Sequence, residues 1–280
     1  MSHTKRTSRN GSPPADPESR QAGDLTRELQ AEARRLELDL FGVVAPGDAD
    51  RYAGIPVDYW EIRRSTVRPA DIMPEVRSVV IVGFSLWDPV LDVAAFDGRR
   101  GAWRYPAYAL MAHRAEKLAG WLLRRGFNVR SAGRLPYKRL AVLAGLGRFG
   151  KNSLVLHPRL GSEFRLACLL TDADLRPMQT PPAENGVDPS WDPCGSCERC
   201  LEACPMGALS PYTVDPEACL VALTLREKAG DINEVDPDVL RRFRALDLAR
   251  YEPRSSPNVH LMCRACQDVC PWNAESAAAG

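Results

Sequence analysis

Cysteine spacing constrains this chain more than any other feature of its sequence. Eight of the nine cysteines among its 280 residues lie between positions 194 and 270. Seven of the eight fall into two runs, each closed by a Cys-Pro pair, and the eighth stands between the runs. The members are Cys194-x2-Cys197-x2-Cys200-x3-Cys204-Pro205, then Cys219, then Cys263-x2-Cys266-x3-Cys270-Pro271. Thiolates at such gaps are typical ligands of 4Fe-4S clusters, and eight thiolates suffice for two clusters.

The first run has the spacing found in bacterial ferredoxins. Three cysteines at gaps of three can wrap a single cluster, whereas the fourth is held away by the Cys-Pro turn and ligates the other cluster. The spacing therefore predicts two ligand groups that exchange members between the runs. One group is Cys194, Cys197, Cys200 and Cys270, and the other is Cys204, Cys219, Cys263 and Cys266.

Two other uses of cysteine are less consistent with this pattern. Zinc sites also use Cys-x2-Cys pairs, but three cysteines at successive gaps of three before a Cys-Pro pair are typical of iron–sulfur proteins. Disulfides form in oxidising compartments, and the first 23 residues lack the apolar core of a secretion signal.

No stretch approaches the 18 apolar residues of a membrane span, so we expect a cytoplasmic protein with no membrane partner. Cys168, within an apolar segment, is expected to fill the core.

Charge gives little indication of a partner. The 37 basic and 36 acidic residues leave a formal net charge of +1, so no overall field attracts a polyanion. Arginine-rich stretches at 124–130 and 241–254 are local candidates for phosphate contacts, and solvated helix faces are the alternative.

Residues 1–23 are rich in Ser, Pro, Arg and Gly and are expected to be disordered. Asp24 is the expected cap of a helix whose apolar positions continue to Leu40, with Gly42 closing it. A second helix carries Met111, Ala115, Leu118 and Leu122 on one face and stops at Gly126.

Short apolar runs predict strands at 78–84, 127–130, 154–157 and 166–171, alternating with helices. Five prolines in residues 177–193 mark a domain boundary. The expected architecture is an α/β (α+β) domain at 24–180, followed by a ferredoxin-like two-cluster domain at 181–280. Within the latter we expect helices starting at Asp215-Pro216 and spanning 237–250, as a helical insertion between Cys219 and Cys263.

Residues 144–153, AGLGRFGKNS, contain three glycines within six positions. The spacing G-x-G-x-x-G fits a dinucleotide-binding loop formally, but a strand-like SLVLH follows where that motif requires a helix. Glycines followed by Lys151 and Asn152 favour close approach of the backbone to a large ligand, with donors for amide or phosphate oxygens.

The sequence resembles the epoxyqueuosine reductases, cobalamin-dependent iron–sulfur enzymes of tRNA modification. The segments that carry the resemblance are AGLGRFGKNSLVLHP, GSEFRLACLLTD, CGSCERCLEACPMGAL, CLVALTLREK and CRACQDVCPWN, in that order. The resemblance implies that an α/β domain holds base-off cobalamin beside the clusters, which supply electrons one at a time. It also implies corrinoid contacts from Gly147, Lys151, Asn152, Ser153, His157 and Arg165.

Two positions depart from the family's pattern. Alignment without gaps places Ser131 where the family has a proton-donating aspartate, and Tyr137 where it has a glutamate. A serine hydroxyl is a poor proton source. Reductive dehalogenases, which share the general layout, use a tyrosine beside a basic residue. Tyr137 with Lys138 is therefore a candidate acid, because a nearby ammonium group lowers the pKa of a phenol.

The resulting hypothesis is a cobalamin-dependent reductase that removes an epoxide oxygen from queuosine precursors in tRNA. It implies a low-potential electron donor such as flavodoxin or ferredoxin, and tRNA as a partner. The alternative is a ferredoxin-like electron-transfer protein without a substrate of its own. A third possibility is reduction of a small organohalide or epoxide. His113 and His260 stand without partner motifs and are expected to be polar residues rather than ligands.

Overall fold

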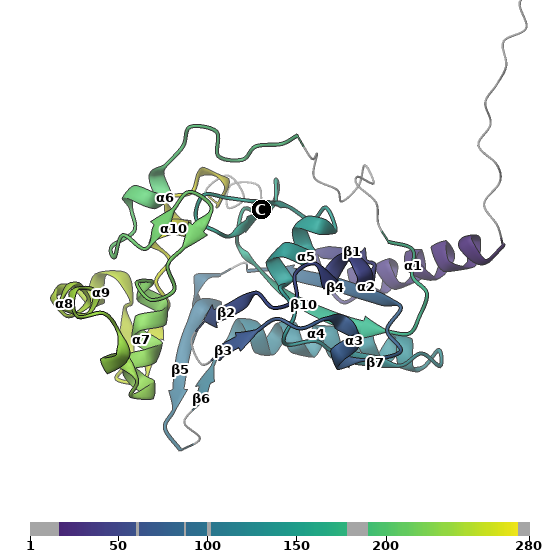
Figure 1. The fold of residues 1–280 in the computed structure, drawn as a ribbon, viewed down its shortest axis with the longest axis horizontal. Helices are drawn as coiled ribbons and strands as arrows, with labels where there is room; N and C mark the ends of the chain where they lie inside the picture. The colour runs from purple at the N-terminus through teal and green to yellow at the C-terminus, as the bar shows by residue number, and fades with distance from the viewer. Residues whose placement is uncertain (1–16, 60–61, 87, 100–101, 178–189, 274–280) are drawn as a thin grey trace, which may run out of the picture.

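A computed structural model describes residues 17–59, 62–86, 88–99, 102–177 and 190–273 of the chain. The N-terminal part is built on a four-stranded sheet, and the cysteine runs lie in the C-terminal part (Figure 1). No helix in the described ranges has the length and apolarity to cross a membrane.

The central sheet has the order β1-β4-β10-β7. Its strands are β1 (Leu40–Val44), β4 (Ser78–Ser85), β10 (Phe164–Thr171) and β7 (Val129–Ser131). All three pairings are antiparallel, with Ile81 facing Gly42 on one side and Cys168 on the other. The expected mixed fold and its two longest strands are confirmed, and the sheet gives it the α+β form.

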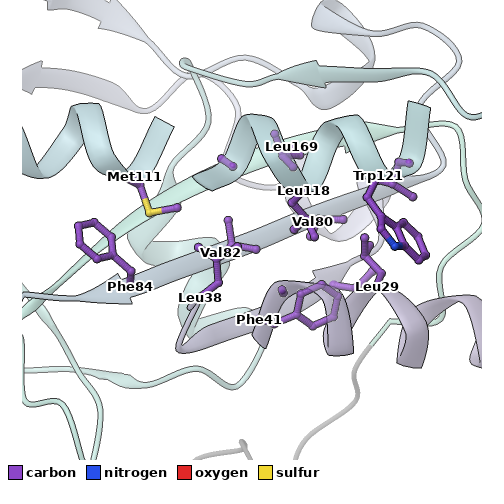
Figure 2. Packing of buried hydrophobic residues seen from close by; sticks show 14 of the residues in the cluster. Leu29, Leu38, Phe41, Val80, Val82, Phe84, Met111, Leu118, Trp121 and Leu169 are labelled. Atoms are coloured by element: carbon purple, nitrogen blue, oxygen red, sulfur yellow. The ribbon is translucent and has the colours of Figure 1, made fainter. Parts of the chain in front are cut away.

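One face of this sheet is covered by two long helices, α1 (Pro17–Arg35) and α4 (Pro106–Leu123). Side chains alternate between faces along a strand, so Val80, Val82 and Phe84 of β4 share one side. Figure 2 shows them meeting Leu29 of α1 and Leu118 of α4 in one buried cluster.

The opposite face packs against α5 (Tyr137–Leu143) and the hairpin of β8 (Arg148–Phe149) and β9 (Val155–Leu156). Val79 and Ile81 of β4 point to this side, where they join Leu140 of α5 in a second core. Residues on both sides of β4 are therefore buried, which explains its unbroken apolar sequence.

The first helix differs from the expectation at both ends. It begins at Pro17, so part of the segment expected to be disordered is helical, while residues 1–16 lie outside the described range. It ends at Arg35 because Glu37 adopts a left-handed φ of 56° and the amide of Leu38 turns back to the carbonyl of Ala33. Leu40 and Gly42 belong to β1 instead. A β-carbon on Gly42 would lie 2.6 Å from Cβ of Ala144, so this strand position requires glycine.

A second sheet joins the two parts of the chain, with the order β13-β14-β5-β6. Its strands are β5 (Val93–Asp97), β6 (Ala102–Arg104), β13 (Arg254–Ser256) and β14 (Val259–Leu261). Since β14 pairs antiparallel with β5, main-chain hydrogen bonds connect the cysteine-containing part to the first domain.

The insertion between Cys219 and Cys263 is mainly helical, as expected, although it ends in the β13–β14 hairpin. It contains α7 (Leu220–Ala229), η2 (Ile232–Glu234), α8 (Pro237–Ala245) and α9 (Leu248–Tyr251). Asp236 caps α8 by accepting from two amides of its first turn. The expected start at Asp215-Pro216 is wrong: Asp215 accepts the amides of Ala218 and Cys219 in a turn, and α7 begins only at Leu220.

The remaining elements are short. They are α2 (Pro46–Asp50), β2 (Pro56–Tyr59), β3 (Ile62–Ser65), α3 (Pro69–Ile72), η1 (Pro89–Asp92), α6 (Arg199–Glu202), β11 (Leu209–Ser210), β12 (Thr213–Val214) and α10 (Ala265–Asp268). Most of the proline-rich boundary, residues 178–189, falls outside the described residues, so the division at 180 stays a prediction.

Candidate functional site

Four cysteines from both runs line a single cavity of about 180 Å³. They are Cys194, Cys197, Cys200 and Cys270, the set predicted as one ligand group. The short helix α6 lies within the first run and α10 lies within the second. The two helices pack against each other and bring the runs together. The cavity wall is completed from the first domain by Lys151, Asn152 and Leu156.

Three of the other four cysteines, Cys204, Cys219 and Cys263, pack against the same buried cluster of side chains. Burial raises the pKa of the Cys263 thiol to about 12, and negative charge on Cys219 and Cys204 adds to the shift. The pKa of Cys266 is raised by burial and by the same neighbours. Thiols that disfavour each other's ionisation lie close together and need a bound cation to become thiolates. Their proximity supports the second predicted ligand group.

All nine cysteines are free thiols, as the choice of clusters over disulfides requires. Cys168 lies in the core between β10 and α5, 2% exposed, and this confirms its expected structural role. Among the residues that the structure describes, no three His, Cys, Asp or Glu side chains converge closely enough to hold a single metal ion. Support for clusters therefore comes from the shared cavity and from the mutual effects of the thiols.

The glycine segment forms the β8–β9 hairpin and not a phosphate-binding loop. A β-carbon on Gly147 would come within 2.5 Å of the Leu156 carbonyl oxygen, and one on Gly150 would lie 2.8 Å from Leu156 Cδ1. These glycines are therefore needed for the two strands to approach each other. Their expected role as an open contact surface for a corrinoid is not supported.

Lys151 and Asn152, at the tip of this hairpin, face the first cysteine group. The amide of Lys151 donates to Sγ of Cys194 at 3.3 Å, and its ammonium group lies 3.2 Å from Oε1 of Glu198. Asn152 is buried in the wall of the same cavity. Both residues are therefore better placed to touch a cluster than a corrinoid. A hydrogen bond from a backbone amide to a ligand sulfur is a common means of adjusting cluster potential.

The side chains of His157 and Arg165 already have partners within the protein. Nδ1 of His157 accepts the amide of Arg159 at 3.1 Å, and burial lowers the pKa of His157 to about 4, so the ring is neutral at pH 7. Arg165 pairs with the buried Asp92. Neither side chain presents the free polar surface expected of a corrinoid contact.

Tyr137 and Lys138 point in different directions. The hydroxyl of Tyr137 donates to the carbonyl of Ala132 at 2.8 Å, and burial raises the pKa of this phenol. The expected lowering of its pKa by Lys138 is therefore wrong. Nζ of Lys138 donates instead to the carbonyl of Ser153 at 2.9 Å, and Ser131 is exposed on β7.

Lys138 is the predicted residue that best connects the first domain with the second cysteine group. Its side chain is exposed, yet desolvation lowers its pKa, while negative charge on Cys219 and Cys266 acts to raise it. Ser153, with a left-handed φ of 61°, presents its carbonyl to the same ammonium group.

Two sets of contacts were not predicted. Asn273 accepts the amide of Ser162 at 2.7 Å and donates to the carbonyl of Gln267 at 2.9 Å, all in the interior. A set of buried charges around Asp92 joins the second cysteine run to the first domain. The partners are up to 172 residues apart, so local sequence patterns carry no signal for them.

The fold and the eight thiols define an iron–sulfur protein with an α+β domain and a two-cluster module. Residues 193–273 match the family model described as "4Fe-4S double cluster binding domain". The expected resemblance to epoxyqueuosine reductases is also confirmed. The chain is 29% identical over 220 residues to an epoxyqueuosine reductase from Synechocystis, in an alignment that covers 75% of this chain and 67% of the relative.

Solved structures agree with this likeness. An epoxyqueuosine reductase crystallised with an epoxyqueuosine-modified tRNA stem loop has a TM-score of 0.60 and 21% identity, covering 90% of this chain and 66% of that one. A catabolic reductive dehalogenase has a TM-score of 0.55 and 16% identity, covering 92% and 33%. At these identities the structures show a shared fold. The chain spans about two thirds of the solved epoxyqueuosine reductase.

Proposed function

We propose that this protein is an iron–sulfur, cobalamin-dependent reductase that acts on epoxyqueuosine in tRNA. The observation that carries the proposal is the meeting of four cysteines from both runs in the wall of a single cavity, while three of the other four pack against one buried cluster. The names of the sequence relatives supply the reaction, and one solved relative supplies tRNA as the substrate class.

The first cluster would be held by Cys194, Cys197, Cys200 and Cys270, and the second by Cys204, Cys219, Cys263 and Cys266. Cys200 links the two sets, since its charge contributes to the raised pKa of Cys266. Two such clusters would supply one-electron transfer, with Lys151 beside the first cysteine group and Lys138 within reach of the charges of the second. A low-potential donor such as flavodoxin or ferredoxin would serve as the source.

We infer that a corrinoid would contact Lys138 and Ser153. Gly147, Lys151, Asn152 and His157 are less suited, because they are engaged in hairpin packing, in the wall of the first cysteine cavity or in internal hydrogen bonds. A bound corrinoid would supply the cobalt centre at which an epoxide C–O bond is reduced. Lys138 would face it beside the second cysteine group, since the charges of Cys219 and Cys266 act on its ammonium group.

Lys138 is also the better candidate for the proton donor. Its ammonium group has a lowered pKa, and an acid is most effective when its pKa approaches the working pH. Tyr137 has a raised pKa and its hydroxyl already donates a hydrogen bond to the Ala132 carbonyl, while Ser131 is a weak acid. In this proposal Lys138 donates the proton and Tyr137 holds the start of α5 in place.

We place the protein in the cytoplasm, where tRNA is modified and thiols stay reduced. No observation specifically favours the alternative of a simple electron carrier, since the relatives carry the name of a reductase.

The test uses anaerobically reconstituted protein, hydroxocobalamin, a chemical reductant and tRNA that contains epoxyqueuosine. We expect stoichiometric binding of the corrinoid with a base-off absorption spectrum, followed by conversion of epoxyqueuosine to queuosine in digested tRNA. Corrinoid binding without conversion would contradict the substrate and leave reduction of a small molecule. Failure to bind the corrinoid would contradict the reductase.

A further inference from the structure

A chain of buried charges begins inside the second cysteine run. Arg264 lies between two predicted cluster ligands, Cys263 and Cys266, and its side chain is only 7% exposed. Nη1 of Arg264 donates to Oδ2 of Asp92 at 2.6 Å, and the Asp92 side chain is 2% exposed. A residue at the end of η1 in the first domain therefore holds a residue within the ligand run.

Asp92 and Arg264 also have further charged partners. Arg165, on β10, donates to Oδ1 of Asp92, and Nη2 of Arg264 pairs with Glu163. Nε of Arg264 also donates to Oδ1 of the more exposed Asp268 at 3.2 Å, so two guanidinium groups are paired with three carboxylates. Removing one member of a buried ion pair leaves its partner's charge uncompensated, which is strongly unfavourable.

The backbone of Asp92 holds the same segment. The last pair of the β14–β5 ladder is Leu261 with Val93, and the next amide, that of Met262, donates to the Asp92 carbonyl at 3.1 Å. Main-chain pairing therefore extends to the residue before Cys263. The Asp92 carboxylate adds a side-chain contact one residue after Cys263, at Arg264.

We propose that Asp92 is a positioning residue that, through Arg264, fixes the second cysteine run for cluster binding. The inference rests on the proposed function, because it requires the second cysteine group to hold a cluster. Ligands held by outer contacts keep the geometry that the metal centre needs. Without the Asp92 charge, Arg264 and Arg165 lose their shared counter-ion. Arg264 then keeps only Glu163 and the exposed Asp268, and the side-chain attachment of the ligand run to η1 is lost.

Asp92→Asn tests this directly, because it preserves size and removes charge. After anaerobic reconstitution we expect about half the iron of the wild type, about four atoms instead of about eight per chain. One of the two cluster signals in the EPR spectrum of the reduced protein should be lost, and Asp92→Glu should restore part of it. The matched control is Asp174→Asn, which breaks an exposed 2.6 Å pair with Arg77 and should keep both signals.

Unchanged iron content and an unchanged EPR spectrum in Asp92→Asn would overturn the inference. Should that variant fail to fold, Arg264→Gln decides, since it leaves Asp92 paired with Arg165. It should lose the same cluster signal, and full iron with a wild-type spectrum would refute the positioning role. Wild-type protein that binds far fewer than about eight irons would instead overturn the proposed clusters and this inference with them.

Discussion

The side-chain oxygen of Asn273 stands where a β-carbon on Gly161 would have to lie. Gly161 has a left-handed φ of 55°, and the next residue, Ser162, donates its amide to the same oxygen at 2.7 Å. The end of the second cysteine run is therefore locked against a turn that follows β9. Only glycine satisfies both the conformation and the space at this turn.

Gly161→Ala should lower the free energy of unfolding by about 2 to 4 kcal/mol, since it adds a steric clash to the cost of a left-handed alanine. Urea unfolding at neutral pH measures the effect. Gly126→Ala is the matched control, because Gly126 has a φ of 86° but no atom within 4 Å of the added carbon. Equal losses in the two variants would show that Asn273 does not restrict the site.

His157 should make the protein sensitive to acid. Burial lowers its pKa from 6.5 to about 4, so the folded state binds this proton more weakly than the unfolded state. The stabilisation is present above pH 6.5 and is lost as the pH falls toward 4, by about 2 kcal/mol between pH 7 and pH 5.

His157→Asn should reduce this loss in urea unfolding curves recorded at pH 7 and pH 5. His113→Asn, at an exposed position of α4, should leave the acid sensitivity as it is in the wild type. An identical pH dependence in wild type and His157→Asn would contradict the assignment to His157.

The two classes of cysteine should separate by iron content. Cys204→Ser removes a predicted ligand of the second cluster and should retain about four of about eight irons. Cys168→Ser alters a buried core thiol and should retain all of them, with some loss of stability from burying a hydroxyl. Iron analysis with EPR spectroscopy decides, and comparable iron loss in both variants would count against the ligand assignment.

Lys138→Met should lower the rate of epoxyqueuosine reduction by about 100-fold or more, because loss of a general acid commonly costs that much. Tyr137→Phe should stay within a few-fold of the wild type, since it removes only the hydrogen bond to Ala132. Single-turnover assays with corrinoid-loaded protein compare the two. The reverse order of effects would restore Tyr137 as the acid.

The four cysteines that line one cavity could be recognised in the sequence because cluster ligation is encoded in short spacings. Cys194, Cys197 and Cys200 must lie together whatever the rest of the chain does. The buried strand at 78–84 and the helix α4, which ends at Leu123 shortly before Gly126, were also predictable, since each is a continuous local pattern.

The glycine segment was misread for a physical reason. Gly147 and Gly150 are required by the packing of the hairpin onto Leu156, and sequence alone does not distinguish close packing from ligand contact. Lys151 lies in the wall of the first cysteine cavity, and its contact with a corrinoid stays a prediction. No local pattern indicated that Asp92 is part of a buried ion pair. Its partner Arg264 is 172 positions away, and each looks like an ordinary surface charge in sequence.

The pairing of β14 with β5 has a consequence for dividing the chain. A fragment that ends at residue 177 would keep both cores of the central sheet. In it, β5 would still pair with β6 but would lose its other neighbour, β14. Its free amides and carbonyls would then form an open edge, which invites pairing between copies and aggregation. The cysteine-rich part therefore also acts as a protective cover, and the two parts are best produced together.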